Sequence, residues 1–233
     1  ANEDLAVAAI ESVANLKTQA LNEDVAKCLN DSRWRVRVAA LQGLEKQKAA
    51  SALDAVAYKA RRDPEAPVRQ AALQTLAGME HDAAFDALRS IATTVQRPAA
   101  DRMTAITLLV ENDLEKSLDT VRRVIDDEWA VESSRLLDAT AKALVSTTSP
   151  ALGTVYERLL QHPNYIIRIY AIRGIGRSGL SEFGPEIQRI AAESSANIVR
   201  SSALATLDLL GIPPLATEDE SEADDAVPID EGN

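Results

Sequence analysis

Apolar residues recur at helical spacing in six separated stretches of the chain. In the clearest stretch, residues 36–44, the apolar side chains of Val36, Ala40, Leu41 and Leu44 fall on one side of a helix that turns about 100° per residue. The same spacing of three, four and seven residues returns in the later stretches, although the fourth stretch fits it worst. The pattern therefore predicts amphipathic helices, each of which buries one stripe.

An arginine returns at the same place in every stretch, at intervals of 32 or 33 residues. These arginines are Arg37, Arg69, Arg102, Arg135, Arg168 and Arg200. A fixed period of this length is typical of stacked repeats that bury their apolar faces against one another. Counting other positions from the arginine, the apolar stripe occupies offsets −1, +3, +4 and +7. The sequence predicts an all-α fold, an α-solenoid of about six antiparallel helix pairs.

The chain divides into a leading helix, a repeat domain and a tail. We expect residues 1–19 to form a helix that caps the open apolar end of the stack, and residues 20–211 to form the repeats. The helix pairs are expected at about 20–47, 48–79, 80–112, 113–147, 148–178 and 179–211.

The composition changes after Pro213 and Pro214. Residues 216–233 contain eight acidic and no basic residues, so of the net charge of −11 the remaining 215 residues carry only −3. Such a segment buries too little apolar surface to fold alone, and we expect a disordered acidic tail over residues 212–233. Two interpretations stay open: a solubilising end, or a mobile anionic arm that competes for a basic surface and is anchored by Val227-Pro228-Ile229.

Composition bounds the remaining properties of the chain. Hydrophobic residues make up 46% of it but aromatic residues only 3%, so burial must come from Ala, Leu, Val and Ile. No apolar run reaches the roughly 20 residues needed to cross a bilayer, which predicts a soluble body. The single cysteine, Cys28, excludes an internal disulfide framework and is expected in the core. A cytoplasmic location is favoured, and an exported protein whose signal peptide has been removed stays open.

A loop aspartate followed by Val-Arg-x-x-Ala-Leu-x-x-Leu marks the repeats, most clearly in residues 63–73. This pattern resembles the HEAT-repeat family, in its compact short-period form, over roughly residues 20–210. The resemblance implies a right-handed superhelix in which each arginine pairs with the loop aspartate of an adjacent repeat. The implied structural ladder consists of Asp31, Arg37, Asp63, Arg69, Arg102, Arg135, Arg168 and Arg200. The last four copies have Gln96, Trp129, His162 and Ser194 in place of the loop aspartate, so their arginines need other partners.

The sequence predicts neither a catalytic residue nor a cofactor or metal site. Its two histidines, His81 and His162, lie in different repeats, whereas a metal ion needs several converging ligands. Phosphate-binding loops, nucleophile elbows and Cys-x-x-Cys pairs do not occur. Clusters of basic residues at 33–37 and 59–62 fall on different helices of a slightly acidic body, so no nucleic-acid partner is expected.

The second helices of the pairs are expected to line the concave surface, where a partner would bind. Offset +1 lies on their exposed flank, and four of its six side chains are apolar. The predicted partner-binding residues are Met103, Leu136, Ile166, Ile169, Tyr170 and Arg173. The alternative interpretation is that these side chains fill gaps between neighbouring helices.

The sequence therefore predicts a non-enzymatic scaffold or adaptor that binds a protein or peptide along this surface, and assembly into a larger complex is left open. One alternative is a HEAT-type bilin lyase or chaperone that acts on a protein partner. A HEAT-like DNA-binding or glycosylase protein is the least favoured alternative.

Overall fold

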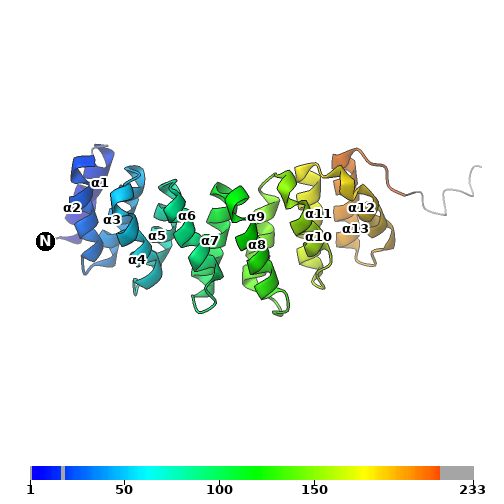
Figure 1. Ribbon diagram of the computed structural model, residues 1–233, viewed down its shortest axis with the longest axis horizontal. Coiled ribbons are helices and arrows are strands. Elements are labelled where there is room, and N and C mark those ends of the chain that lie inside the picture. Colours follow the sequence, from blue (N-terminus) through cyan, green and yellow to red (C-terminus); the bar gives the residue numbers. More distant parts are fainter. Residues whose placement is uncertain (1, 17–18, 216–233) are drawn as a thin grey trace, which may run out of the picture. The chain divides into compact units, whose positions relative to one another are not determined.

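The computed structural model describes residues 2–16 and 19–215, and of the predicted disordered tail, residues 212–233, the part from residue 216 onward lies outside them. The described residues form thirteen α-helices and five short 3₁₀ turns, and contain no β-strand. The fold is thus all-α, and its helices follow one another as antiparallel pairs (Figure 1). None of the described helices combines the length and apolar character needed to span a bilayer. The chain divides into two compact units, residues 1–143 and 144–233.

The first unit is a stack of helix pairs preceded by one helix. Its helices are α1 (Glu3–Asn15), α2 (Asn22–Lys27), α3 (Trp34–Lys46), α4 (Leu53–Arg62), α5 (Ala66–Gly78), α6 (Asp82–Thr93), α7 (Ala99–Asn112), α8 (Leu114–Glu128) and most of α9 (Arg135–Val145). The second helices α3, α5 and α7 pack in one layer, and α1 packs against α3 on the other flank. Ile10 and Ala14 of α1 are buried there, and Gly43 of α3 allows the close approach.

The second unit contains two helix pairs. Its elements are the 3₁₀ turn Pro150–Leu152, α10 (Gly153–Leu160), α11 (Tyr165–Ser178), the 3₁₀ turn Ser181–Phe183, α12 (Gly184–Glu193) and α13 (Asn197–Leu210). α11 and α13 pack side by side, and each packs against its own first helix. Both end at a glycine in the left-handed conformation, Gly179 with φ of 65° and Gly211 with φ of 68°, a backbone geometry that glycine adopts without strain.

The stripe predicted from the sequence is buried in the first, second, third and fifth copies, and three of its four residues are buried in the sixth. At offset +4, for example, Leu41, Leu73, Ile106 and Ile172 are fully buried. Adjacent second helices are also tied by a hydrogen bond, because the Thr75 hydroxyl donates to the Leu41 carbonyl at 3.2 Å. Thr206 makes the equivalent bond to the Ile172 carbonyl at 3.1 Å. The +4 residue therefore faces the following second helix.

The fourth copy corrects the predicted register. The buried residues of α9 are Leu136, Leu137, Thr140, Ala141, Ala143 and Leu144. A stripe at Leu136, Thr140, Ala141 and Leu144 is the pattern −1, +3, +4 and +7 counted from Leu137. The α8–α9 loop thus shifts the repeat by two residues, and Arg135 is not the counterpart of the other arginines. It is exposed, and it makes no hydrogen bond or ion pair with the described residues.

The arginines of four copies share a bond to the turn that precedes their own helix. Nη1 of Arg37 donates to the carbonyls of Asp31 and Ser32, six and five residues earlier, at 2.9 and 3.1 Å. Arg69 and Arg168 repeat both bonds, and Arg200 repeats the bond to the carbonyl six residues earlier. The shared role of these arginines is therefore to satisfy the carbonyls of the turn within the pair.

Bonds from the arginines to carboxylates are less regular. Arg37 donates to both carboxylate oxygens of Asp63 in the next repeat, at 2.9 and 2.8 Å. The carboxylate that Arg69 contacts, 2.8 Å away, belongs to Asp101 on α7 and not to a loop. Arg102 contacts Glu128 at the end of α8.

The loop aspartates do not bind the helix amides. The carboxylates of Asp31 and Asp63 accept hydrogen bonds from the backbone amides two residues ahead, those of Arg33 and Glu65, which directly precede α3 and α5.

Cys28 departs from the expectation that it lies in the core. Its thiol is only half-buried and donates to the Asp24 carbonyl at 3.4 Å, because α2 is short and ends at Lys27.

Candidate interaction groove

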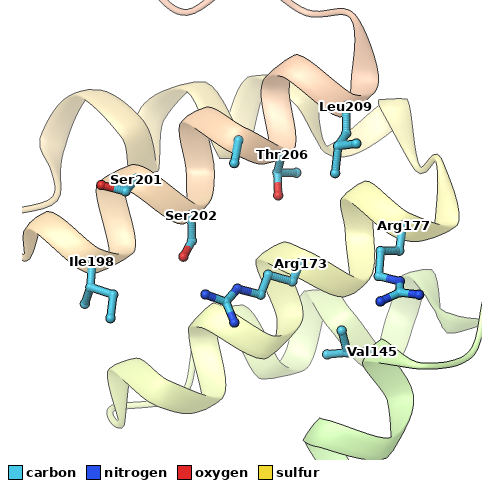
Figure 2. A pocket seen from close by; sticks show the side chains of 9 residues that line it. Val145, Arg173, Arg177, Ile198, Ser201, Ser202, Thr206 and Leu209 are labelled. Carbon is cyan, nitrogen blue, oxygen red and sulfur yellow. The ribbon is translucent and has the colours of Figure 1, made fainter.

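A groove lies between the second helices of the last two repeats, within the second unit (Figure 2). Its volume is about 550 Å³. It is lined by Val145, by Arg173 and Arg177 of α11, and by Ile198, Ser201, Ser202, Ala205, Thr206 and Leu209 of α13. We call this set the α11–α13 groove. It is an open surface feature of the size that a short peptide can fill.

Small side chains on α13 create the groove. The residues of α13 that line it recur every three or four positions and so share one face of the helix. In the middle of this face stand Ser201, Ser202 and Ala205, which are too short to fill the space towards α11. At offset +1 the first, second, third and fifth copies carry the larger side chains of Val38, Gln70, Met103 and Ile169, whereas the last copy carries Ser201.

The charge in the groove is entirely positive. Arg173 and Arg177, one turn apart on α11, are the charged residues that line it, and both are exposed. Neither guanidinium makes a hydrogen bond or an ion pair with the described residues. In contrast, the equally exposed Arg189 on α12 is paired with Glu186 and Glu193. The groove therefore presents two cations whose hydrogen-bonding capacity is available to an anionic ligand.

Two exposed apolar side chains flank the small residues. Ile198 is 55% exposed and Leu209 is 67% exposed, near opposite ends of α13. Figure 2 shows them at either end of the α13 ribbon, with Ser202 and Thr206 between them and the two arginines on the facing helix. An apolar edge beside unpaired arginines is the composition of a protein-binding surface, in which arginine is enriched and the apolar side chains are desolvated on binding.

Of the six residues predicted to bind a partner, only Arg173 lines this groove. Ile169 is 5% exposed and Leu136 is 3% exposed, so the expectation that their side chains lie on an exposed flank is wrong. Ile169 is covered because the second helices pack side by side. Leu136 is buried because of the register shift in α9, which makes it a stripe residue.

The other predicted residues are more accessible. Ile166 is exposed, while Met103 and Tyr170 are half-buried. Met103 and Leu136 belong to the first unit and the other four to the second. Partner binding by any of these residues stays a prediction.

Most residues of the groove were not predicted from the sequence. Ile198 occupies offset −2, which points away from the core like +5, the offset of Arg173 and Ala205. An apolar residue at an outward offset was therefore a usable signal. Ser201, the small residue at offset +1, was a second one. Arg177 lies beyond the end of the repeated pattern, and only its spacing of four from Arg173 connects it to the site.

A smaller hollow of about 350 Å³ lies between α1 and α3 in the first unit. It contains acidic side chains, Asp4 and Glu11, as well as Arg35. The Arg35 guanidinium lies 5.6 Å from the centre of the Trp34 ring, a distance that permits a cation–π contact. Since opposite charges are mixed and Arg35 already has an aromatic neighbour, this hollow is a weaker candidate for ligand binding.

The histidines have structural surroundings. Nδ1 of His81 accepts the Ala83 amide at 3.2 Å at the start of α6, and Nδ1 of the buried His162 accepts the Asn164 amide at 3.0 Å. Within residues 2–16 and 19–215, no three histidine, cysteine or acidic side chains lie close enough to hold a metal ion.

Tyr156 is a buried titratable group of the second unit. Burial raises the pKa of its phenol to about 12, and the hydroxyl donates to the Leu144 carbonyl at 2.9 Å. The neutral phenol thus serves as a hydrogen-bond donor in the core.

Comparison with solved structures supports the architecture. The chain is similar to a chain of the complex of CpcE and CpcF of phycocyanin lyase from Nostoc sp. PCC7120, with 17% identity, a TM-score of 0.51, and coverage of 82% of this chain and 77% of that one. It is also similar to a mutant of Kap121p, with 15% identity and a TM-score of 0.55 over 87% of this chain. This chain spans only 25% of Kap121p. No family model and no curated protein matches the sequence.

The chain has a HEAT-like helical fold. Identities of 15% and 17% relate the backbone arrangements and carry no functional residue from one protein to another. Function in this HEAT-like chain must therefore be argued from its own surface.

Proposed function

We propose that this HEAT-like protein is a non-enzymatic scaffold that binds a protein partner through the α11–α13 groove. The observation that supports this most directly is the combination of two unpaired arginines with the exposed side chains of Ile198 and Leu209. A solvated surface gains nothing from leaving large apolar side chains exposed beside unpaired cations. A partner segment that buries the apolar pair and supplies carboxylates satisfies both features.

The rigidity of the site also favours binding. α11 and α13 are joined by the Thr206–Ile172 hydrogen bond, so the groove is preformed and a ligand does not have to order its walls. A helical peptide of about four turns, or an extended peptide of about six residues, matches the length of α13, since its 14 residues span about 21 Å. We propose a short peptide segment, rather than a large flat domain, as the bound element.

The proposal is tested by affinity capture from the cells that make the protein, followed by quantitative mass spectrometry. The native chain is compared with the double variant Ile198→Asp, Leu209→Asp, which replaces the two exposed apolar side chains by charged ones without changing a buried residue. We expect the retained partner to fall at least about tenfold, because burying two apolar side chains contributes roughly 1.5–3 kcal/mol each.

The matched control is Tyr58→Asp, Val95→Asp, which alters two exposed apolar residues of the first unit. This variant is expected to retain the partner as the native chain does. Equal retention by the groove variant and the native chain would contradict the proposal.

A second candidate function is a bilin lyase or chaperone. The observation that favours it is the likeness to a chain of the CpcE–CpcF complex over most of both chains. The test is to incubate the purified protein with a free bilin and record the absorption spectrum after gel filtration. A retained, spectrally shifted pigment would support this function, and a protein fraction without pigment would exclude it.

A further inference from the structure

We infer that the acidic segment 216–233 of the same chain binds in the α11–α13 groove, so that a partner must displace it. This inference rests on the proposed function of the groove and names the chemistry of its ligand. The observation on which it depends is the matching of charge and apolar character between a groove with two unpaired arginines and the sequence that follows α13.

The charges are segregated along the second half of the chain. Residues 144–215 contain six arginines and five acidic residues, whereas residues 216–233 contain eight acidic and no basic ones. Arg168 and Arg200 bond to the turns before their helices, and Arg189 pairs with acidic residues of α12. Arg158 also has an interaction partner, whereas Arg173 and Arg177 line the groove. Charge attraction therefore favours this groove as the place where the acidic segment docks.

The apolar part of the segment matches the groove as well. Val227-Pro228-Ile229 stands between acidic residues on both sides, at 224–225 and 230–231. A short apolar core flanked by carboxylates can place its side chains on Ile198 or Leu209 and its charges at Arg173 and Arg177. The carboxylate–guanidinium pairs would be bidentate where geometry allows.

The chain between α13 and Val227 is long enough to reach the α11–α13 groove. The described chain leaves α13 at Leu210 and runs along α12, where the Gln188 side-chain amide donates to the Pro213 carbonyl at 2.6 Å. Eleven residues lie between Leu215 and Val227, and the twelve Cα–Cα steps from one to the other span up to about 40 Å when extended. The α13 helix is about 21 Å long, so the segment reaches every part of the groove, including the side facing α11.

Tethering makes even a weak contact effective. A short flexible connection gives an effective concentration of about 1 mM, so a segment that binds as a free peptide with a Kd of about 100 µM occupies its groove in roughly nine chains of ten. An added peptide of the same sequence then binds the native chain about tenfold more weakly than a chain whose own segment has lost its charge.

The experiment measures fluorescence anisotropy of a labelled synthetic peptide of residues 216–233. Its first target is the full chain in which the eight acidic residues of the segment are changed to Asn or Gln, and its second is the native chain. We expect binding to the first target and at least about fivefold weaker binding to the second. Adding Arg173→Glu and Arg177→Glu to the first target should weaken binding at least about tenfold.

The matched control adds Arg122→Glu and Arg123→Glu to the first target. These exposed arginines of α8 form ion pairs with Asp119 and Asp127. Because two arginines are again changed to glutamate, the control makes the same change in net charge away from the groove. It is expected to bind the peptide within about twofold of the first target.

Four outcomes would overturn the inference. Three are no binding to the neutralised chain, equal binding to the native chain, or equal loss in the α8 control. The fourth is a competition in the native chain that grows with protein concentration, because it would indicate exchange of the segment between two copies. If the peptide fails to bind while the Ile198→Asp, Leu209→Asp variant still loses its partner, only this inference fails. If the peptide binds but the Ile198→Asp, Leu209→Asp variant retains the partner as the native chain does, only the proposed function fails.

Discussion

Asp63 is a buried carboxylate of the first unit with several bonding partners. It accepts two hydrogen bonds from Arg37 and one from the Glu65 amide, and Lys59 lies 3.7 Å away. Burial alone would raise the pKa of Asp63, but these bonds and the two positive charges lower it below its usual value. Both members of the Asp63–Arg37 pair are buried, so removing the carboxylate charge leaves a buried cation without compensation.

We expect Asp63→Asn to destabilise the first unit by about 3 kcal/mol at neutral pH. Because the pKa of Asp63 is lowered in the folded state, its contribution is complete above the unfolded pKa of about 4 and is lost as the pH falls further. The difference between variant and native protein should therefore shrink below pH 4.

Urea unfolding followed by tryptophan fluorescence measures this effect, since Trp34 and Trp129 both lie in the first unit. Asp31→Asn is the matched control, because Asp31 stands at the same offset but its partner Arg33 is partly exposed. A loss in Asp31→Asn as large as in Asp63→Asn would refute the role assigned to burial.

The α10–α11 pair of the second unit depends on a close approach at Gly174. A Cβ atom on Gly174 of α11 would overlap the ring of Tyr156, which is fully buried on α10 and bonded to the Leu144 carbonyl. The phenol cannot move outward without losing that bond. Gly174 thus sets the distance between the two helices of this pair.

Gly174→Ala should destabilise the second unit by about 2 kcal/mol, the usual cost of overpacking. The matched control is Gly153→Ala, where the new methyl group would lie 3.7 Å from the Phe183 ring, an ordinary contact. This control should be neutral or stabilising by up to about 1 kcal/mol, because alanine favours the helix. Hydrogen exchange of the α10 and α11 amides reports both effects, and protection that is lost equally in both variants would count against the overlap.

At the scale of the whole chain, the last described second helix has an uncovered flank. Leu204 occupies offset +4, where earlier copies are buried by the following helix, yet it is 42% exposed. Leu204 is therefore expected to stabilise the fold less than the buried stripe residues do, because no described helix covers it.

We therefore expect Leu204→Ala to change the stability of the second unit by less than about 1 kcal/mol, while Ile172→Ala at the same offset costs about 3 kcal/mol. Hydrogen exchange of α11 and α13 amides compares the two. A large loss in Leu204→Ala would mean that this flank is covered in solution, for instance by a second copy.

The sequence predicted an all-α fold of helix pairs, because the period of the apolar stripe and the turn prolines are local signals. It misplaced the fourth copy, since Arg135 imitated the recurrent arginine while Leu137 occupied its place. It missed the groove because a groove is defined by what small side chains such as Ser201 leave unfilled. The unfilled space depends on the distance between two packed helices, and the positions of apolar residues along the sequence do not give that distance.

The bonds from Arg37, Arg69, Arg168 and Arg200 to the backbone of their own turns have a consequence for how such chains evolve. In these four copies the arginine and the turn that it stabilises belong to the same hairpin, so a gene segment coding for one of these periods can be duplicated or lost without breaking the turn bonds of the others. Array length is then a heritable variable, and new binding surfaces arise by copying a hairpin and altering its outward side chains.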